Sequence, residues 1–180
     1  MGKGFPGVCI LALFALASSA QAVPTAVSVT SVRFEQRRLP GQSYPWLEAA
    51  VNVRPSGMTA PENIQIKLWI LYQSPSGKFV YEGRAQLYSL NDPAIVRFYL
   101  PPDVLRARRL AQTPTGYYLE LSSSAGAEAF DNSHASPSLF SGTARAELKG
   151  VPTQALLPHY NTPFYSLPET FRDLPSYVVP

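Results

Sequence analysis

The chain contains few side chains of the types that catalyse reactions or bind metals. It has two histidines, His134 and His159, and one cysteine, Cys9. Neither histidine has a second one at the spacing of a metal-binding pair, so the sequence predicts no zinc site. Asp131, Ser133 and His134 include the residue types of a hydrolytic triad, but neighbours along one loop cannot orient one another as that chemistry requires. We therefore predict no catalytic residues, no metal and no cofactor.

The carboxylates and the short sequence motifs also give no indication of catalysis. Glu48, Glu120 and Glu147 alternate with apolar residues along predicted strands, so we expect them on solvated sheet faces. No spacing marks two carboxylates that would face each other across a cleft, as glycoside hydrolysis requires. The glycine-rich motifs of nucleotide binding and the G-x-S-x-G elbow are absent from the sequence. We predict that the protein is not an enzyme.

Two further groups of residues allow a binding role. Arg106, Arg108 and Arg109 would form an anion-binding patch, although basic residues are also typical of a helix C-terminus, where they complement the helix dipole. Trp46 and Trp69 would form a platform for stacking sugars, although at least one of them is expected in the core. Both pairs of alternatives stay open from the sequence alone.

Composition indicates one folded, β-rich domain. The 180 residues are 46% hydrophobic and 15% charged, which excludes a disordered chain and a coiled coil. The 18 prolines work against long helices. The net charge of +3 is too small and too scattered to indicate nucleic-acid binding.

The first 22 residues are typical of an export signal. Lys3 precedes an apolar run at 8–17, which is too short to span a bilayer, and Ala20 and Ala22 fit a signal-peptidase site. Cleavage after Ala22 would remove the only cysteine and leave no apolar segment long enough to cross a membrane. A domain without disulfides or an N-x-S/T glycosylation site favours the periplasm or cell surface of a bacterium.

Residues 23–150 show the two-residue periodicity of strands. Turn residues separate short segments at 26–37, 46–54, 64–73, 78–84, 85–90, 94–100, 117–123 and 141–149. A change of phase between Val29 and Val32 predicts a β-bulge. Pro101-Pro102-Asp103 predicts the start of one short helix that continues over 104–111. This pattern predicts an all-β, antiparallel, immunoglobulin-like sandwich with one short helix, and a long loop at 124–140.

Residues 151–180 form a tail of different composition. It contains six prolines and five aromatic residues, so we expect an extended segment with turns. The tail either folds back on its own sandwich, with Trp69 and Leu71 as natural contacts, or binds another protein as an extended peptide. The candidate partner-binding residues are Tyr160, Phe164, Tyr165, Phe171, Tyr177 and Trp69.

Several segments together resemble a known family. They are V-T-S-V-R-F-E at 29–35, F-Y-L-P-P-D-V-L-R-A-R-R-L at 98–110, G-Y-Y-L-E-L at 116–121, N-T-P-F-Y at 161–165 and F-R-D at 171–173. The chain resembles the small exported immunoglobulin-like proteins of Verrucomicrobia that occur with type IV pilus or secretin-type assembly genes. It departs from them after T-P-F, where Tyr165-Ser166-Leu167-Pro168 replaces a tryptophan-rich stretch. The resemblance implies a structural role in or near a pilus-like envelope assembly.

We therefore expect a non-catalytic exported protein that acts through protein–protein contacts with envelope or pilus-assembly proteins. No nucleic acid and no integral membrane segment are expected after cleavage. The alternative from a different class is a carbohydrate-binding β-sandwich module at the cell surface, with glycans as ligands.

Overall fold

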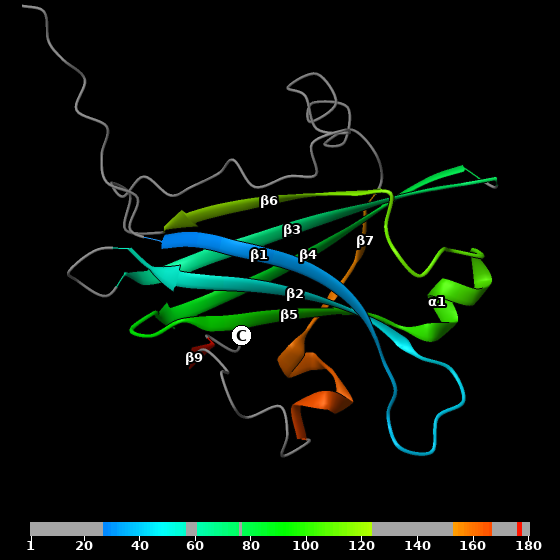
Figure 1. Cartoon of the computed structure of the whole chain (residues 1–180), viewed down its shortest axis with the longest axis horizontal. Helices are drawn as coiled ribbons and strands as arrows, with labels where there is room; N and C mark the ends of the chain where they lie inside the picture. Colours follow the sequence, from blue (N-terminus) through cyan, green and yellow to red (C-terminus); the bar gives the residue numbers. More distant parts are fainter. Residues whose placement is uncertain (1–26, 57–60, 76, 124–152, 167–175, 178–180) are drawn as a thin grey trace, which may run out of the picture.

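The computed structural model describes residues 27–56, 61–75, 77–123, 153–166 and 176–177. Two β-sheets pack face to face (Figure 1). The first sheet has the order β1 (Val27–Arg37), β2 (Trp46–Pro55), β5 (Ala94–Leu100), β8 (Leu157–Pro158). The second has the order β6 (Gly116–Ser123), β3 (Glu62–Ser74), β4 (Gly77–Ser89), β7 (Thr153–Ala155), and β9 (Ser176–Tyr177) also pairs with β4. The predicted export signal, the loop at 124–140 and the strand at 141–149 lie outside the described residues.

This strand order confirms the predicted immunoglobulin-like β-sandwich. The sheets β1-β2-β5 and β6-β3-β4 correspond to the A-B-E and F-C-C′ strands of that architecture. All pairs among these six strands are antiparallel. The tail strand β7 pairs in parallel with β4, so the second sheet is mixed at this edge. Within the described residues, no helix is both long and apolar enough to cross a membrane.

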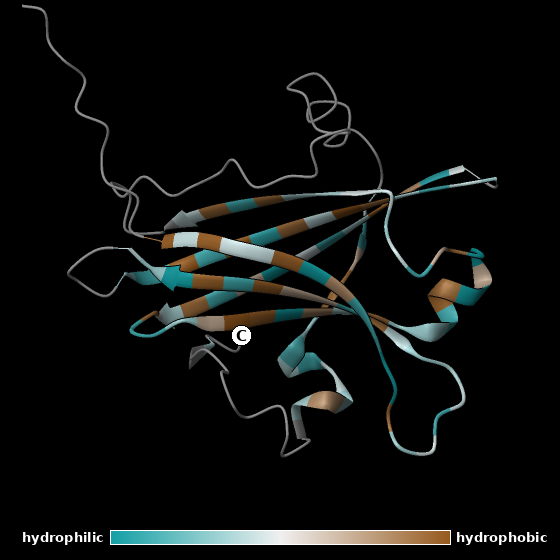
Figure 2. Cartoon of the chain, viewed as in Figure 1, coloured by the Kyte–Doolittle hydropathy of each residue, from teal (hydrophilic) through white to brown (hydrophobic). Residues whose placement is uncertain are grey.

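The core lies between the two sheets and follows from the alternation of residue types. In β3, Ile64, Ile66, Leu68 and Ile70 are fully buried against the facing sheet. The alternating bands of hydrophobic and hydrophilic residues along the strands are visible in Figure 2. Burial of one such aliphatic side chain contributes about 1.5–3 kcal/mol, which makes this layer the main source of stability.

The hairpin of β3 and β4 is longer than the sequence predicted. Ser74 pairs with Gly77, whose φ of 131° suits glycine, and pairing continues to Glu62 opposite Ser89. The predicted strands at 78–84 and 85–90 are therefore one strand. Gly83 lies at its centre, where a side chain would place its Cβ only 2.6 Å from the ring of Phe98 on the other sheet.

The bulge in β1 and the end of the helix are both set by nearby residues. The register of β1 shifts between Val29 and Ser31, which confirms the predicted bulge. The helix α1 spans Pro102–Ala107 and stops earlier than predicted. It stops because Arg109 takes a positive φ of 51°, and because the amide of Leu110 donates a hydrogen bond to the carbonyl of Leu105.

The C-terminal tail closes the open side of the sandwich. β7 pairs with β4, and Leu156 then enters the core beside Gly83. β8 pairs with β5 of the other sheet, and β9 returns to β4. The described tail residues thus fold back on the chain's own sandwich and bridge the edges of both sheets.

Candidate functional site

A buried group of charged residues lies on the outer face of the first sheet. Glu48 on β2 and Arg97 on β5 point away from the core because their neighbours Leu47 and Phe98 point into it. The Glu48 carboxylate is 3.2 Å from the Nε of Arg37 and 3.8 Å from the Nε of Arg97. Glu48 is only 3% exposed, so the prediction that it lies on a solvated sheet face is wrong.

Tyr99 completes this group from the position directly opposite Glu48. Its hydroxyl donates a hydrogen bond of 2.7 Å to the Glu48 carboxylate. Burial raises the pKa of Tyr99, and the hydrogen bond to the charged carboxylate raises it further. The tyrosine thus stays protonated and remains a donor at any physiological pH.

The tail covers these residues with two short 3-10 turns, η1 (His159–Asn161) and η2 (Pro163–Ser166). The ring of Phe164 stacks on Tyr99 with centroids 4.6 Å apart and meets Trp46 edge-on at 5.7 Å. Phe164 is 2% exposed. We define the tail-docking site as Trp46, Glu48, Arg97 and Tyr99 on the sheet together with His159 and Phe164 on the tail.

His159 is the titratable residue that the tail itself places in this site. It is fully buried, with its ring 5.8 Å from Tyr99 and 5.6 Å from Tyr165. Burial lowers the pKa of His159 below its ordinary value of 6.5, and the charge of Arg97 adds to this effect, whereas a backbone hydrogen bond with Phe164 and the charge of Glu48 oppose it. The neutral imidazole is therefore the form that the docked tail accommodates.

Acidification is expected to release the tail. Above the ordinary pKa of 6.5, His159 is neutral whether the tail is docked or free, so docking is unaffected by pH. As the pH falls below that value, the free tail takes up a proton that the docked tail does not, and docking weakens. We expect a lower urea midpoint for tail release at pH 5.5 than at pH 7.5, measured by the emission of Trp46 in a Trp69→Phe background.

Two matched variants separate this effect from general acid destabilisation. His159→Gln is expected to remove most of the difference between the two pH values. His134→Gln removes the other histidine and is expected to keep the difference. An equal pH dependence in His159→Gln and the parent protein would contradict this role of His159.

The structure places the predicted partner-binding residues in different environments. Phe164 is buried in the tail-docking site, whereas Tyr165 beside it is 42% exposed. Tyr160 and Tyr177 are half-buried and meet edge-on at 5.3 Å, and the backbone amide of Arg97 donates to the Tyr177 hydroxyl. Phe171 lies outside the described residues. The tail residues that are described therefore gather at the β4–β5 side of the sandwich.

Trp69 does not belong to this group. It lies on the other sheet, where its ring contacts Tyr118 at 5.5 Å. The described tail residues pack their buried ring, Phe164, on Trp46 and Tyr99. The expectation that Trp69 and Leu71 receive the tail is therefore wrong for the described part of the tail. Trp46 and Trp69 are each 9% exposed, and neither offers the open ring face of a sugar platform.

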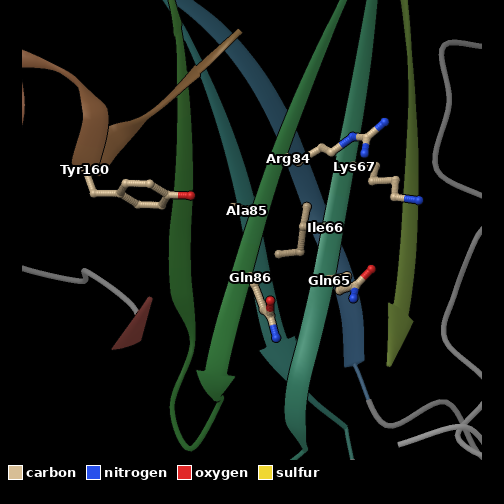
Figure 3. Close-up of a pocket in the computed structure, with 7 residues that line it drawn as sticks. All are labelled: Gln65, Ile66, Lys67, Arg84, Ala85, Gln86 and Tyr160. Atoms are coloured by element: carbon tan, nitrogen blue, oxygen red, sulfur yellow. The ribbon is translucent and has the colours of Figure 1, made fainter. Parts of the chain in front are cut away.

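A shallow hollow lies beside the tail on the second sheet. It has a volume of about 320 Å³ and is lined by polar and apolar residues of β3 and β4 and by Tyr160 of the tail. Figure 3 shows Tyr160 extending from η1 toward the strand that carries Arg84 and Gln86. The positive charge of Arg84 is balanced by an ion pair with Glu82. Among the described residues, no group of three His, Cys, Asp or Glu side chains is placed to bind a metal ion.

Two residues of the tail-docking site, Arg97 and Tyr99, were not singled out from the sequence. Arg97 was a visible signal, because it interrupts the otherwise apolar strand A-I-V-R-F-Y-L. A charge inside such a strand requires a buried partner, and Glu48 on the neighbouring strand provides it. His159 gave a second signal as the only histidine in the tail.

Comparisons with known proteins support the fold but do not assign the chain to a family. No protein-family model matches the chain. No curated protein matches its sequence. A crystal structure of a protein from Akkermansia muciniphila is similar in fold, with a TM-score of 0.57 and 12% sequence identity. The similarity covers 91% of this chain and 98% of that protein. At this identity the similarity establishes the architecture alone.

Proposed function

We propose that this chain is a non-catalytic exported protein that acts through protein–protein contacts in a type IV pilus-like or secretin-type assembly of the bacterial envelope. The observation that carries the proposal is the tail, which holds short strands against both sheets and seals the buried carboxylate and histidine from solvent. A titratable group that no substrate can reach stabilises the fold and takes no part in catalysis.

Two further findings support the proposal. The protein of similar fold comes from Akkermansia muciniphila, a member of the Verrucomicrobia, the group to which the sequence resemblance points. The described tail also leaves Tyr165 exposed beside its buried anchor Phe164. Exposed tyrosines next to rigid anchors are typical of protein interfaces.

Cross-linking tests the role of the tail in contact with partners. A photoreactive residue at position 165 is expected to capture secretin or pilus-assembly proteins, identified by mass spectrometry, when the protein is expressed in its native envelope. The same residue at Tyr88, which is 60% exposed on β4, serves as a matched control with fewer captured partners.

Truncation after Gly150 provides a complementary test under conditions where circular dichroism and size-exclusion chromatography show a folded monomer, because the deletion removes Leu156 from the core and uncovers the edges of β4 and β5. We expect it to lose the partners that the full chain retains. Equal retention of the same partners by the full and truncated chains would show that the tail is not the contact element. Captured proteins that include no envelope component in either experiment would contradict the proposed assembly.

A further inference from the structure

A basic groove lies beside α1, at the end of the sandwich where β1 and β5 end. It has a volume of about 370 Å³ and is formed by two segments, residues 36–45 and 102–112. Arg38, Arg106 and Arg109 line it together with Tyr44, and all four side chains are exposed. Leu105 and Leu110 contribute apolar surface. The groove therefore combines positive charge with apolar surface.

The three arginines have no carboxylate partner in the described part of the chain. The ion pairs there involve Arg37, Arg84 and Arg97 instead. Asp103 lies on the same helix but forms no ion pair with Arg106. The groove thus presents unneutralised guanidinium groups, and each presents a planar pair of donors that matches a carboxylate.

One of these arginines is held in place before any ligand arrives. The guanidinium of Arg106 lies over the ring of Tyr44, with 4.1 Å between its central carbon and the ring centroid. This cation–π contact restricts the side chain. Binding through a restricted side chain loses less conformational entropy than binding through a free one.

Arg109 occupies a backbone position that favours glycine. Its φ of 51° is in the left-handed region, where a non-glycine residue is disfavoured. The residue just past a helix end with this conformation is most often glycine. The chain thus carries a guanidinium at a position where glycine would suit the backbone better.

We propose that this groove binds an acidic segment of a partner protein, with carboxylates on Arg38, Arg106 and Arg109 and an apolar side chain on Leu105 and Leu110. The inference deepens the proposed function and rests on it only in taking the partner to be a protein. The apolar floor favours a peptide over an inorganic anion or a uniformly charged glycan, which would have nothing to place on it.

Calorimetry on the full chain tests the inference with defined probes. The ligand is an eight-residue peptide of Asp and Glu with a central Leu, and the control peptide has Asn and Gln in place of the acids. We expect the acidic peptide to bind and the neutral one to bind at least about tenfold more weakly, because charge-assisted hydrogen bonds are lost. Failure of the acidic peptide to bind the parent protein would overturn the inference.

Arg109→Gly separates binding from folding. It removes the guanidinium and relieves the positive φ, so we expect about tenfold weaker peptide binding with an unchanged or higher urea midpoint. Arg54→Ala removes the same charge from an exposed position at the far end of β2 and is expected to leave peptide binding unchanged. Equal losses in the two variants would indicate a general charge effect and overturn the site.

Competition identifies the ligand class. Polygalacturonate or inorganic phosphate that displaces the peptide at equal carboxylate or phosphate concentration would overturn the assignment to a protein segment. These results are independent of the cross-linking at position 165, so the groove and the proposed envelope role can fail separately.

Discussion

Glu48→Gln is expected to lower the free energy of unfolding by about 3–5 kcal/mol, the usual loss when one partner of a buried ion pair is removed. Glutamine keeps the shape of the side chain and still accepts a hydrogen bond from Tyr99. It leaves the Arg97 guanidinium, whose side chain is 10% exposed, without a negative charge nearby. Arg37 is far more exposed and contributes little to the loss. Urea unfolding followed by circular dichroism measures the change.

Two variants control this result. Glu35 lies directly opposite Glu48 on β1 but is exposed, so Glu35→Gln is expected to change stability by less than about 0.5 kcal/mol. The double variant Glu48→Gln with Arg97→Met removes both buried charges and is expected to recover much of the lost stability. Similar losses for Glu48→Gln and Glu35→Gln would show that the buried pair does not stabilise the fold as argued.

Phe164→Ala is expected to release the tail from the first sheet. The ring is buried between Tyr99 and Trp46, and truncation of a buried phenylalanine costs about 3–5 kcal/mol. Trp46 would lose one of its two aromatic neighbours and become more exposed to water, so its emission is expected to shift to longer wavelength in a Trp69→Phe background. Chymotrypsin is expected to cut the released tail at residues 153–166 under native conditions.

Tyr165→Ala is the matched control, because it removes a neighbouring aromatic ring that is largely exposed. It is expected to leave the Trp46 emission and the rate of cleavage close to those of the parent protein. An unchanged emission spectrum in Phe164→Ala would mean that other residues hold the tail in place.

The sandwich could be predicted from the sequence because the signals for its strands and turns are local. The alternation in β3 and the turn before Gly77 are both readable within a dozen residues. The prediction divided the long strand β4 into segments at 78–84 and 85–90, and no local turn motif accounts for the glycine at position 83. The glycine is instead required by a distant residue, the Phe98 ring on the facing sheet, and the sequence does not show that contact.

The candidate site was less predictable because it depends on pairing between distant segments. Alternation correctly placed Glu48 on an outer face, but the expected solvent is replaced by tail residues more than 100 positions away. The aromatic residues of the tail indicated burial without indicating which sheet would receive them. The sequence indicated a patch of Arg106, Arg108 and Arg109, but it did not show that Arg108 lies over Phe79 and that Arg38 joins the other two in the groove.

The position of the tail strands in the chain has a consequence for biogenesis. The segments that pair with the edges of β4 and β5 are synthesised well after those two strands. Until they leave the ribosome, both edges and the gap that receives Leu156 stay open, and unpaired edges promote aggregation. The nascent chain therefore benefits from a holding chaperone until these segments have emerged, and loss of the tail by premature termination would yield an aggregation-prone product.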